Sequence, residues 1–159
     1  MQNIQSYLTI GGLLLFSLTS LRFNSAILDT STADLENKVY LTAFSLADDM
    51  IEEMKVKSFD QNTVEFPVSN PAALTLNLGH GASEVYPNYN DVDDFNGFNK
   101  TVDEPHAEGY VVSCVVQYVT ESDPDVVSST QTFYKKATVT VTSPYMRHAV
   151  SLSFIFTLK

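Results

Sequence analysis

The chain has 159 residues, of which 44% are hydrophobic and 18% charged. This composition fits one folded domain with an appendage and excludes a wholly disordered chain. Nineteen acidic residues against nine basic ones give a formal net charge of −10. Such a surface repels phosphate backbones, so we expect no nucleic-acid partner. The single cysteine, Cys114, lies among valines and can form no internal disulfide, so we expect a small buried side chain.

An uncharged apolar segment opens the chain and reaches residue 21. Its strongly apolar part, residues 8–21, is shorter than the roughly 20 residues of a stand-alone transmembrane helix. No basic residue precedes it, and residues 21–23 are unlike the cleavage site of a secretory signal peptide. Small residues such as Gly11 and Gly12 would permit close contacts between helices. We expect a helix that sits in a membrane and later packs among its own copies.

An amphipathic stretch continues the helical pattern without a proline before Pro67. Apolar residues at helical spacing predict one buried face, and a second apolar strip lies beside it. The predicted face is Leu35, Val39, Thr42 or Ala43, Leu46, Met50 and Met54; the strip is Tyr40, Phe44, Ala47 and Ile51. The acidic pairs at 48–49 and 52–53 indicate a solvated side of the same helix.

The predicted helix has one candidate break, at residues 29–32, which resemble an N-cap cluster. Without a break, residues 4–59 would form a rod roughly 80 Å long, at about 1.5 Å per residue. The rest of the chain is too small to cover such a rod, so its first half must find partners elsewhere. We therefore divide the chain into a hydrophobic N-terminal helix, residues 1–30, and a head, residues 31–159, that includes the amphipathic half of the helix.

The second half of the chain predicts an antiparallel sheet. Residues 108–120, 131–142 and 148–158 are rich in β-branched and aromatic residues, and turn-forming clusters separate them. In the second run the inward face is Ala137, Val139 and Val141; in the third it is Val150, Leu152, Phe154 and Phe156. Residues 61–107 predict a long connecting loop with room for one short strand. The expected fold class is α+β, with the sheet packed on the helix.

Few residues suggest chemistry. Asp91, Asp93 and Asp94 could hold a calcium ion, although the spacing does not match an EF-hand; alternatively, they accept backbone N–H bonds and order a loop. His80, His106 and His148 lack zinc-binding spacing. Residues 135–136, both lysines, are expected to meet acids on a neighbouring subunit. No nucleophile-bearing turn is present, so we expect no enzyme and no obligatory cofactor.

The order of a long N-terminal helix, the string Asp-Val-Asp-Asp-Phe-Asn-Gly-Phe at 91–98, and Tyr-Lys-Lys-Ala-Thr-Val-Thr-Val-Thr-Ser-Pro at 134–144 resembles type IV pilin-like proteins. The chain is most similar to minor pilins of the mannose-sensitive haemagglutinin type. The resemblance implies a precursor in the inner membrane, handled by pilus assembly machinery, and then a helical homopolymer at the cell surface. It implies assembly through Leu8, Ile10, Leu13, Leu14, Leu15, Phe16, Leu18, Leu21 and Phe23.

The chain departs from this family at its N-terminus. The family's basic leader and glycine cleavage site are not found, and its glutamate would fall at Gln5 if Met1 were the first residue of the mature chain. A glutamine can only hydrogen-bond where the family's carboxylate would pair with a neighbour's amine.

Two alternatives to a filament subunit stay open. One is a monomeric, membrane-anchored extracytoplasmic binding module whose Asp-rich loop holds a ligand or metal. The other is a minor pseudopilin of a secretion system.

Overall fold

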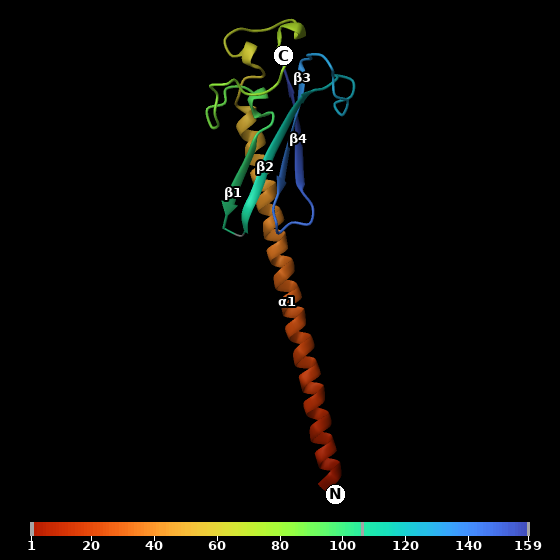
Figure 1. The fold of residues 1–159 in the computed structure, drawn as a ribbon. Helices are drawn as coiled ribbons and strands as arrows, with labels where there is room; N and C mark the ends of the chain where they lie inside the picture. Colours follow the sequence, from red (N-terminus) through yellow and green to blue (C-terminus); the bar gives the residue numbers. More distant parts are fainter. Residues whose placement is uncertain (1, 106, 159) are drawn as a thin grey trace. The chain divides into compact units, whose positions relative to one another are not determined.

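The computed structural model describes residues 2–105 and 107–158. One long helix, α1 (Gln2–Lys55), precedes a sheet of four antiparallel strands in the order β1-β2-β3-β4 (Figure 1). The strands are β1 (Asn99–Glu104), β2 (Ala107–Tyr118), β3 (Tyr134–Thr142) and β4 (Val150–Thr157). The expected α+β fold, a long N-terminal helix packed on an antiparallel sheet, is confirmed. The chain forms two compact units, Met1–Lys38 and Val39–Lys159.

The first unit is helical throughout its described residues, and α1 has no break at the candidate cap of residues 29–32. The hydroxyls of Thr30 and Thr32 donate to the carbonyls one turn back, those of Ala26 and Leu28, each at a distance of 2.9 Å. Side chains that bond back along the helix in this way satisfy themselves inside it rather than capping a new helix.

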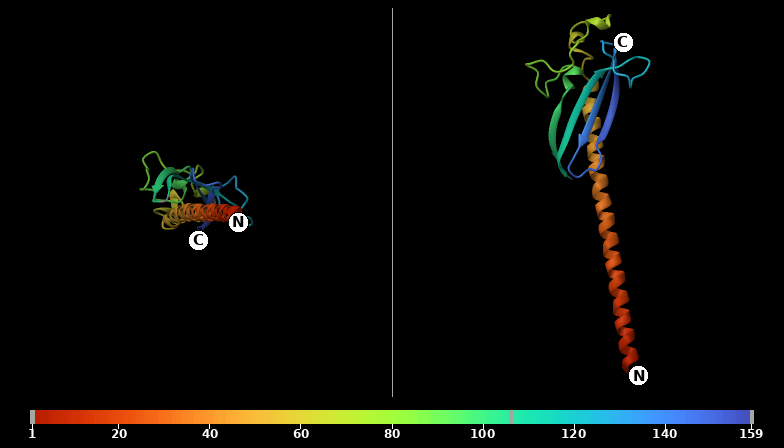
Figure 2. Two further views of the ribbon diagram at one scale, coloured as in Figure 1. Left: turned by 90° about the horizontal axis from the view of Figure 1, so that it is seen from below. Right: turned by 45° about the vertical axis from the view of Figure 1, so that its right-hand side comes forward.

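In the second unit, residues 39–55 of α1 lie along one face of the sheet (Figure 2). The helix buries one stripe against it, made of Val39, Ala43, Ala47, Met50, Ile51 and Met54. The small side chains of Ala43 and Ala47 allow helix and strands to come close. The predicted second strip was wrong at Phe44, which is 50% exposed, because a single sheet covers only one side of the helix.

The sheet shows the alternation that the sequence predicted for β3: Ala137, Val139 and Val141 are all fully buried. Its opposite face is polar, with hydroxyl pairs Thr138–Ser153 and Thr140–Ser151 across β3 and β4, each at 2.9 Å. The face predicted for β4 is only partly buried. This strand lies at the edge of the sheet, so Phe156 is buried while Phe154 is 37% exposed.

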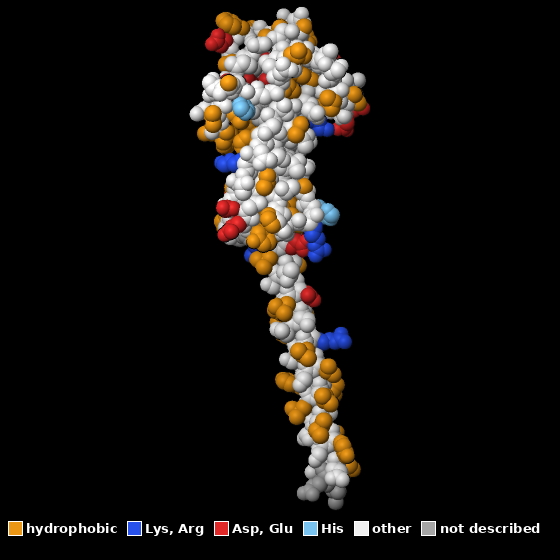
Figure 3. All heavy atoms as spheres, in the orientation of Figure 1, with side chains coloured by type: hydrophobic (Ala, Val, Ile, Leu, Met, Phe, Trp, Pro, Cys, Tyr) orange, Lys and Arg blue, Asp and Glu red, His pale blue; other side chains and the backbone are white. Residues whose placement is uncertain are grey.

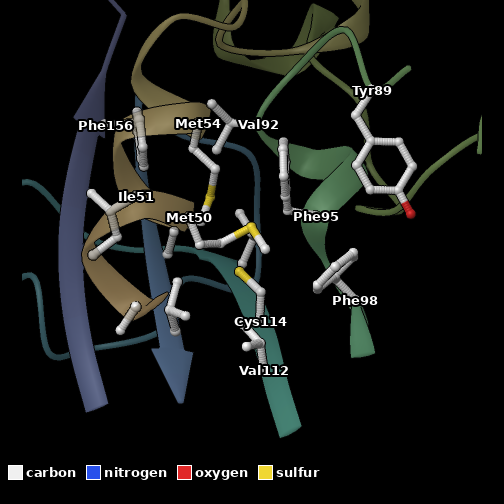
Figure 4. Packing of buried hydrophobic residues seen from close by; sticks show 14 of the residues in the cluster. Met50, Ile51, Met54, Tyr89, Val92, Phe95, Phe98, Val112, Cys114 and Phe156 are labelled. Atoms are coloured by element: carbon white, nitrogen blue, oxygen red, sulfur yellow. The ribbon is translucent and has the colours of Figure 1, made fainter. Parts of the chain in front are cut away.

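The core of the second unit forms between α1, the sheet and the segment before β1 (Figure 4). Met50 and Met54 from α1 meet Phe95 from the 3-10 helix η3 (Asp93–Phe95) and Cys114 from β2. Cys114 is 1% exposed, as the sequence predicted, and burial raises the pKa of its thiol to about 12. Its thiol is therefore neutral at physiological pH and packs as a small apolar group.

The predicted loop between α1 and β2 contains three short 3-10 helices and the one strand for which it had room. The helices are η1 (Gln61–Thr63), η2 (Pro71–Ala73) and η3, and the strand is β1. Strand β1 forms the other edge of the sheet, and four of its six residues are exposed. Its sequence, Asn-Lys-Thr-Val-Asp-Glu, is accordingly polar. Its sequence therefore carries little of the apolar alternation that marks a strand.

We expect a fragment beginning at Thr32 to fold alone, because every buried hydrophobic side chain described in the structure lies at Val39 or beyond. Its near-ultraviolet circular dichroism and thermal transition should match those of the head in the detergent-solubilised full chain. A fragment that unfolds without cooperativity would contradict the division into units.

Candidate functional site

A lysine buried in the second unit is the most unusual group of the structure. Lys135 opens β3 on its core face, and its side chain is fully buried. Its Nζ donates to Asp60 Oδ2 at 2.8 Å, to Asp93 Oδ1 at 2.7 Å and to the carbonyl of Phe59 at 2.8 Å. The ammonium also lies 4.5 Å from the ring centroid of Phe59 and 5.2 Å from that of Tyr118. A buried charge persists only with such partners.

Asp60 is the more heavily bonded of the two carboxylates. Beyond Lys135, it accepts from the backbone N–H of Asn62 at 3.0 Å, from the N–H and hydroxyl of Thr75 at 3.1 and 2.9 Å, and from the Tyr118 hydroxyl at 3.0 Å. Burial by itself would raise the pKa of Asp60, but the hydrogen bond and charge of Lys135, together with the hydrogen bonds of Asn62 and Thr75, hold that pKa below its ordinary value. Asp60 is therefore a carboxylate at neutral pH.

The Asp-rich loop contributes the other carboxylate. Asp91 Oδ1 accepts from the backbone N–H groups of Asp93 at 2.8 Å and Asp94 at 3.2 Å, and Asp94 Oδ2 accepts from that of Asn90 at 2.9 Å. The interpretation that these acids order a loop through backbone N–H bonds is thus confirmed for Asp91 and Asp94. Asp93 instead turns its carboxylate to Lys135.

Asp91 differs from its neighbours because one of its carboxyl oxygens lacks a hydrogen-bond partner in the described part of the chain. Its Oδ2 is buried and accepts no hydrogen bond from any residue that the structure describes. Burial, followed by the hydrogen bond and charge of Asp93, raises the pKa of Asp91 to about 8. Protonation makes Oδ2 a donor instead of an unpartnered acceptor, and the Asp93 side chain that raises this pKa is the neighbouring acceptor group. The unpartnered oxygen and the raised pKa therefore have one explanation.

The cation of this cluster is Lys135. Among the described residues, no group of three or more His, Cys, Asp or Glu side chains is arranged to hold a metal ion. The expectation that both lysines of residues 135–136 meet acids of a neighbouring subunit was wrong for Lys135, because a lysine at an inward-facing strand position needs its counter-ions within the same core. Lys136, on the outer face, pairs with Asp125 of the same chain.

The two described histidines, His80 and His148, lie in separate loops. His80 is exposed and stacks on Tyr89, with ring centroids 5.7 Å apart, while His148 is exposed beside β4. His106 lies outside the described residues. A cavity of about 410 Å³ lies next to His80 and is also lined by Tyr86, Tyr89 and Lys100.

The residues predicted to mediate assembly all lie in the first unit and are exposed (Figure 3). Leu8, Ile10, Leu13, Leu14, Leu15, Phe16, Leu18, Leu21 and Phe23 are between 55% and 73% exposed. A shallow groove beside Gly11 and Gly12 is lined by Ile4, Tyr7, Leu8 and Leu15. Helix α1 is long enough, and near the N-terminus apolar enough, to cross a membrane.

Sequence reasoning did not find the pairing of Lys135 with Asp60. One signal for the lysine was present: counting back by two from Val139 and Ala137 places residue 135 on the core face of β3. Asp60 gives no such signal, since it follows α1 by five residues in irregular chain and meets Lys135 only through the fold.

The structure thus defines an α+β protein whose head is held by a buried ammonium–carboxylate cluster and whose N-terminal helix exposes apolar side chains. Comparisons with protein families, with curated proteins and with solved structures give no match.

We expect Lys135→Met to destabilise the head by about 3–5 kcal/mol, because it leaves the buried Asp60 and Asp93 without a counter-ion. Lys136→Met is the matched control on the same strand and should cost no more than about 1 kcal/mol, since its ion pair is exposed. Urea unfolding of both variants measures the difference. Equal losses of unfolding free energy in the two variants would contradict the conclusion that the buried cluster stabilises the head.

The protonation of Asp91 predicts a pH dependence of stability. A pKa of about 8 in the folded head, against 3.8 when unfolded, means that Asp91 contributes stability that is complete below pH 4 and is lost as the pH rises through 8. Asp91→Asn keeps the Oδ1 acceptor and supplies a permanent donor toward Asp93. The unfolding free energy of this variant should therefore fall less steeply between pH 5 and 9 than that of the wild type, by up to about 1.4 kcal/mol per pH unit. Parallel profiles would show that Asp91 is ionised.

Proposed function

We propose that this chain is a structural subunit of an extracellular type IV pilus-like filament and that it assembles through its N-terminal helix. The observation that carries the proposal is the uncovered apolar surface of residues 8–23. A monomer in water would expose this surface at a high free-energy cost, so it needs a bilayer, partner helices or both.

The size of the effect favours stable assembly. Burying a leucine- or phenylalanine-sized side chain contributes about 1.5–3 kcal/mol, so burying the nine exposed side chains contributes on the order of 14–27 kcal/mol. Association itself costs about 4–15 kcal/mol. Packing among several neighbouring helices can therefore offset the cost of association in water. An inner membrane would meet the same need before assembly, when the pilus assembly machinery handles the subunit.

The second unit supports a position on the outside of such a filament. The outer face of its sheet carries hydroxyl pairs, and Lys135 and Lys136 find their acidic partners within the same chain. Its sheet offers water a polar surface, while the apolar surface that needs covering is concentrated in the first unit. The chain thus separates a segment suited to a filament core from one suited to solvent.

We expect Leu14→Asp to abolish filaments, because a carboxylate on this surface would be buried without a partner among the neighbouring helices. Leu14→Met is the matched control and should assemble normally, since it preserves volume and apolarity. Negative-stain microscopy of filaments sheared from cells that express each variant provides the measurement, with immunoblotting to show equal amounts of subunit.

Microscopy of the wild type, combined with replacement of its N-terminal helix, distinguishes a filament subunit from a membrane-anchored binding module. If the wild type forms no filaments and an unrelated apolar anchor can replace residues 1–30 without loss of function, then the helix is only a tether. If filaments require this helix in particular, it is an assembly interface.

A further inference from the structure

Lys135 and Asp93 lie in contact inside the head as an amine and a carboxyl group could before condensation. Nζ is 2.7 Å from Asp93 Oδ1, and the two side chains are 0% and 2% exposed. We propose that these side chains form a covalent amide, an isopeptide bond between Lys135 Nζ and Asp93 Cγ, in the mature head. The ion pair in the structure is the reactant state of that step.

Hydrogen bonding selects Asp93 rather than Asp60 as the acyl group. Four donors besides Lys135 hold Asp60 as a carboxylate, and a carboxylate is a poor electrophile. The Asp93 carboxylate faces Lys135 on one side and the Asp91 carboxyl on the other. Asp93 is therefore the carboxylate that has a second carboxyl group, Asp91, beside it as a proton source.

Asp91 is the proton donor in this arrangement. Its side chain is fully buried, its Oδ1 is held by two backbone N–H groups, and its remaining oxygen, Oδ2, has no other described partner. The two N–H groups thus hold the Asp91 carboxyl through Oδ1, and the neighbouring Asp93 raises its pKa, so that Oδ2 is the oxygen that carries the proton. Positioned general acids of this kind accelerate acyl transfer by polarising the carbonyl and protonating the leaving group.

The step balances without a further reactant. A proton passes from the Lys135 ammonium to the Asp93 carboxylate, which leaves a neutral amine and a protonated Asp93. The lone pair of Nζ attacks Cγ to form the C–N bond, and Asp91 protonates the departing hydroxyl as the C–O bond breaks. One water molecule leaves, and Asp91 recovers its proton from nitrogen. No oxidation or reduction occurs.

The surroundings favour the neutral product. The rings of Phe59 and Tyr118 cover the ammonium, and Val92 and Phe95 flank the acid, with all four side chains at least nine-tenths buried. Two opposite buried charges carry a desolvation cost that their attraction only partly repays. An amide removes the charges of Lys135 and Asp93 and retains a hydrogen-bonding N–H, while Asp60 keeps its four donors from Asn62, Thr75 and Tyr118.

Peptide mapping of the purified, detergent-solubilised full chain tests the proposal. Trypsin would release residues 58–100, which contain Asp60, Asp91 and Asp93, separately from residues 101–135. With the isopeptide bond, cleavage after Lys135 is blocked, and peptides 58–100 and 101–136 travel as one species lighter by one water molecule than their sum. Fragmentation of that species should place the link at Asp93. Only separate peptides of unchanged mass would overturn the proposal, and a link at Asp60 would overturn the choice of acyl group.

Three variants control the test. Lys136→Arg should retain the linked species, because its side chain lies on the outer face. Lys135→Arg keeps the positive charge and cannot form the bond, so the peptides should separate. Asp91→Asn preserves the hydrogen bonds of the loop but cannot supply a proton, so a folded head with unlinked peptides is expected. Full linkage in a folded Asp91→Asn head would exclude Asp91 as the donor.

Discussion

The head depends on one lysine side chain in a place that water does not reach. Lys135 joins three segments that are distant in sequence: the chain just after α1 at Asp60, the loop before β1 at Asp93, and the first residue pair of β3. Each carboxylate would be costly to bury alone, and so would the lysine. The lysine therefore holds the three segments in place relative to one another.

The same cluster explains how the segment between α1 and β1, residues 56–98, holds one conformation with little regular structure. Asp60 binds Thr75 across the loop, and Tyr118 reaches the Thr75 carbonyl at 2.8 Å. Further along, Asn96 donates to the carbonyl of Leu78 at 3.1 Å and accepts from the N–H of Val116 at 3.0 Å. Side chains here provide the hydrogen bonds that strands and helices obtain from their own backbone.

Much of the fold was predictable because it follows from periodicity. The helix, the three longer strands and the inward face of Ala137, Val139 and Val141 all repeat at 3.6 or 2 residues, which a local pattern records. The polar edge strand β1 and the exposure of Phe44 depend on where the sheet ends, which no local pattern records. The candidate site was half predictable: the acids of the loop were visible, but their partnership with Lys135 arises from tertiary contact alone.

The burial of Cys114 gives the chain a natural reporter. Its sulfur lies in the centre of the sheet, opposite Val139, and is shielded from solvent as a neutral thiol. An alkylating reagent can label it only when the sheet opens, so the labelling rate of the unmodified chain measures how often the head opens as a whole. Such a measurement could follow the subunit in a bilayer and among its own copies, and so tell whether the surroundings of the helix alter the mechanical integrity of the head.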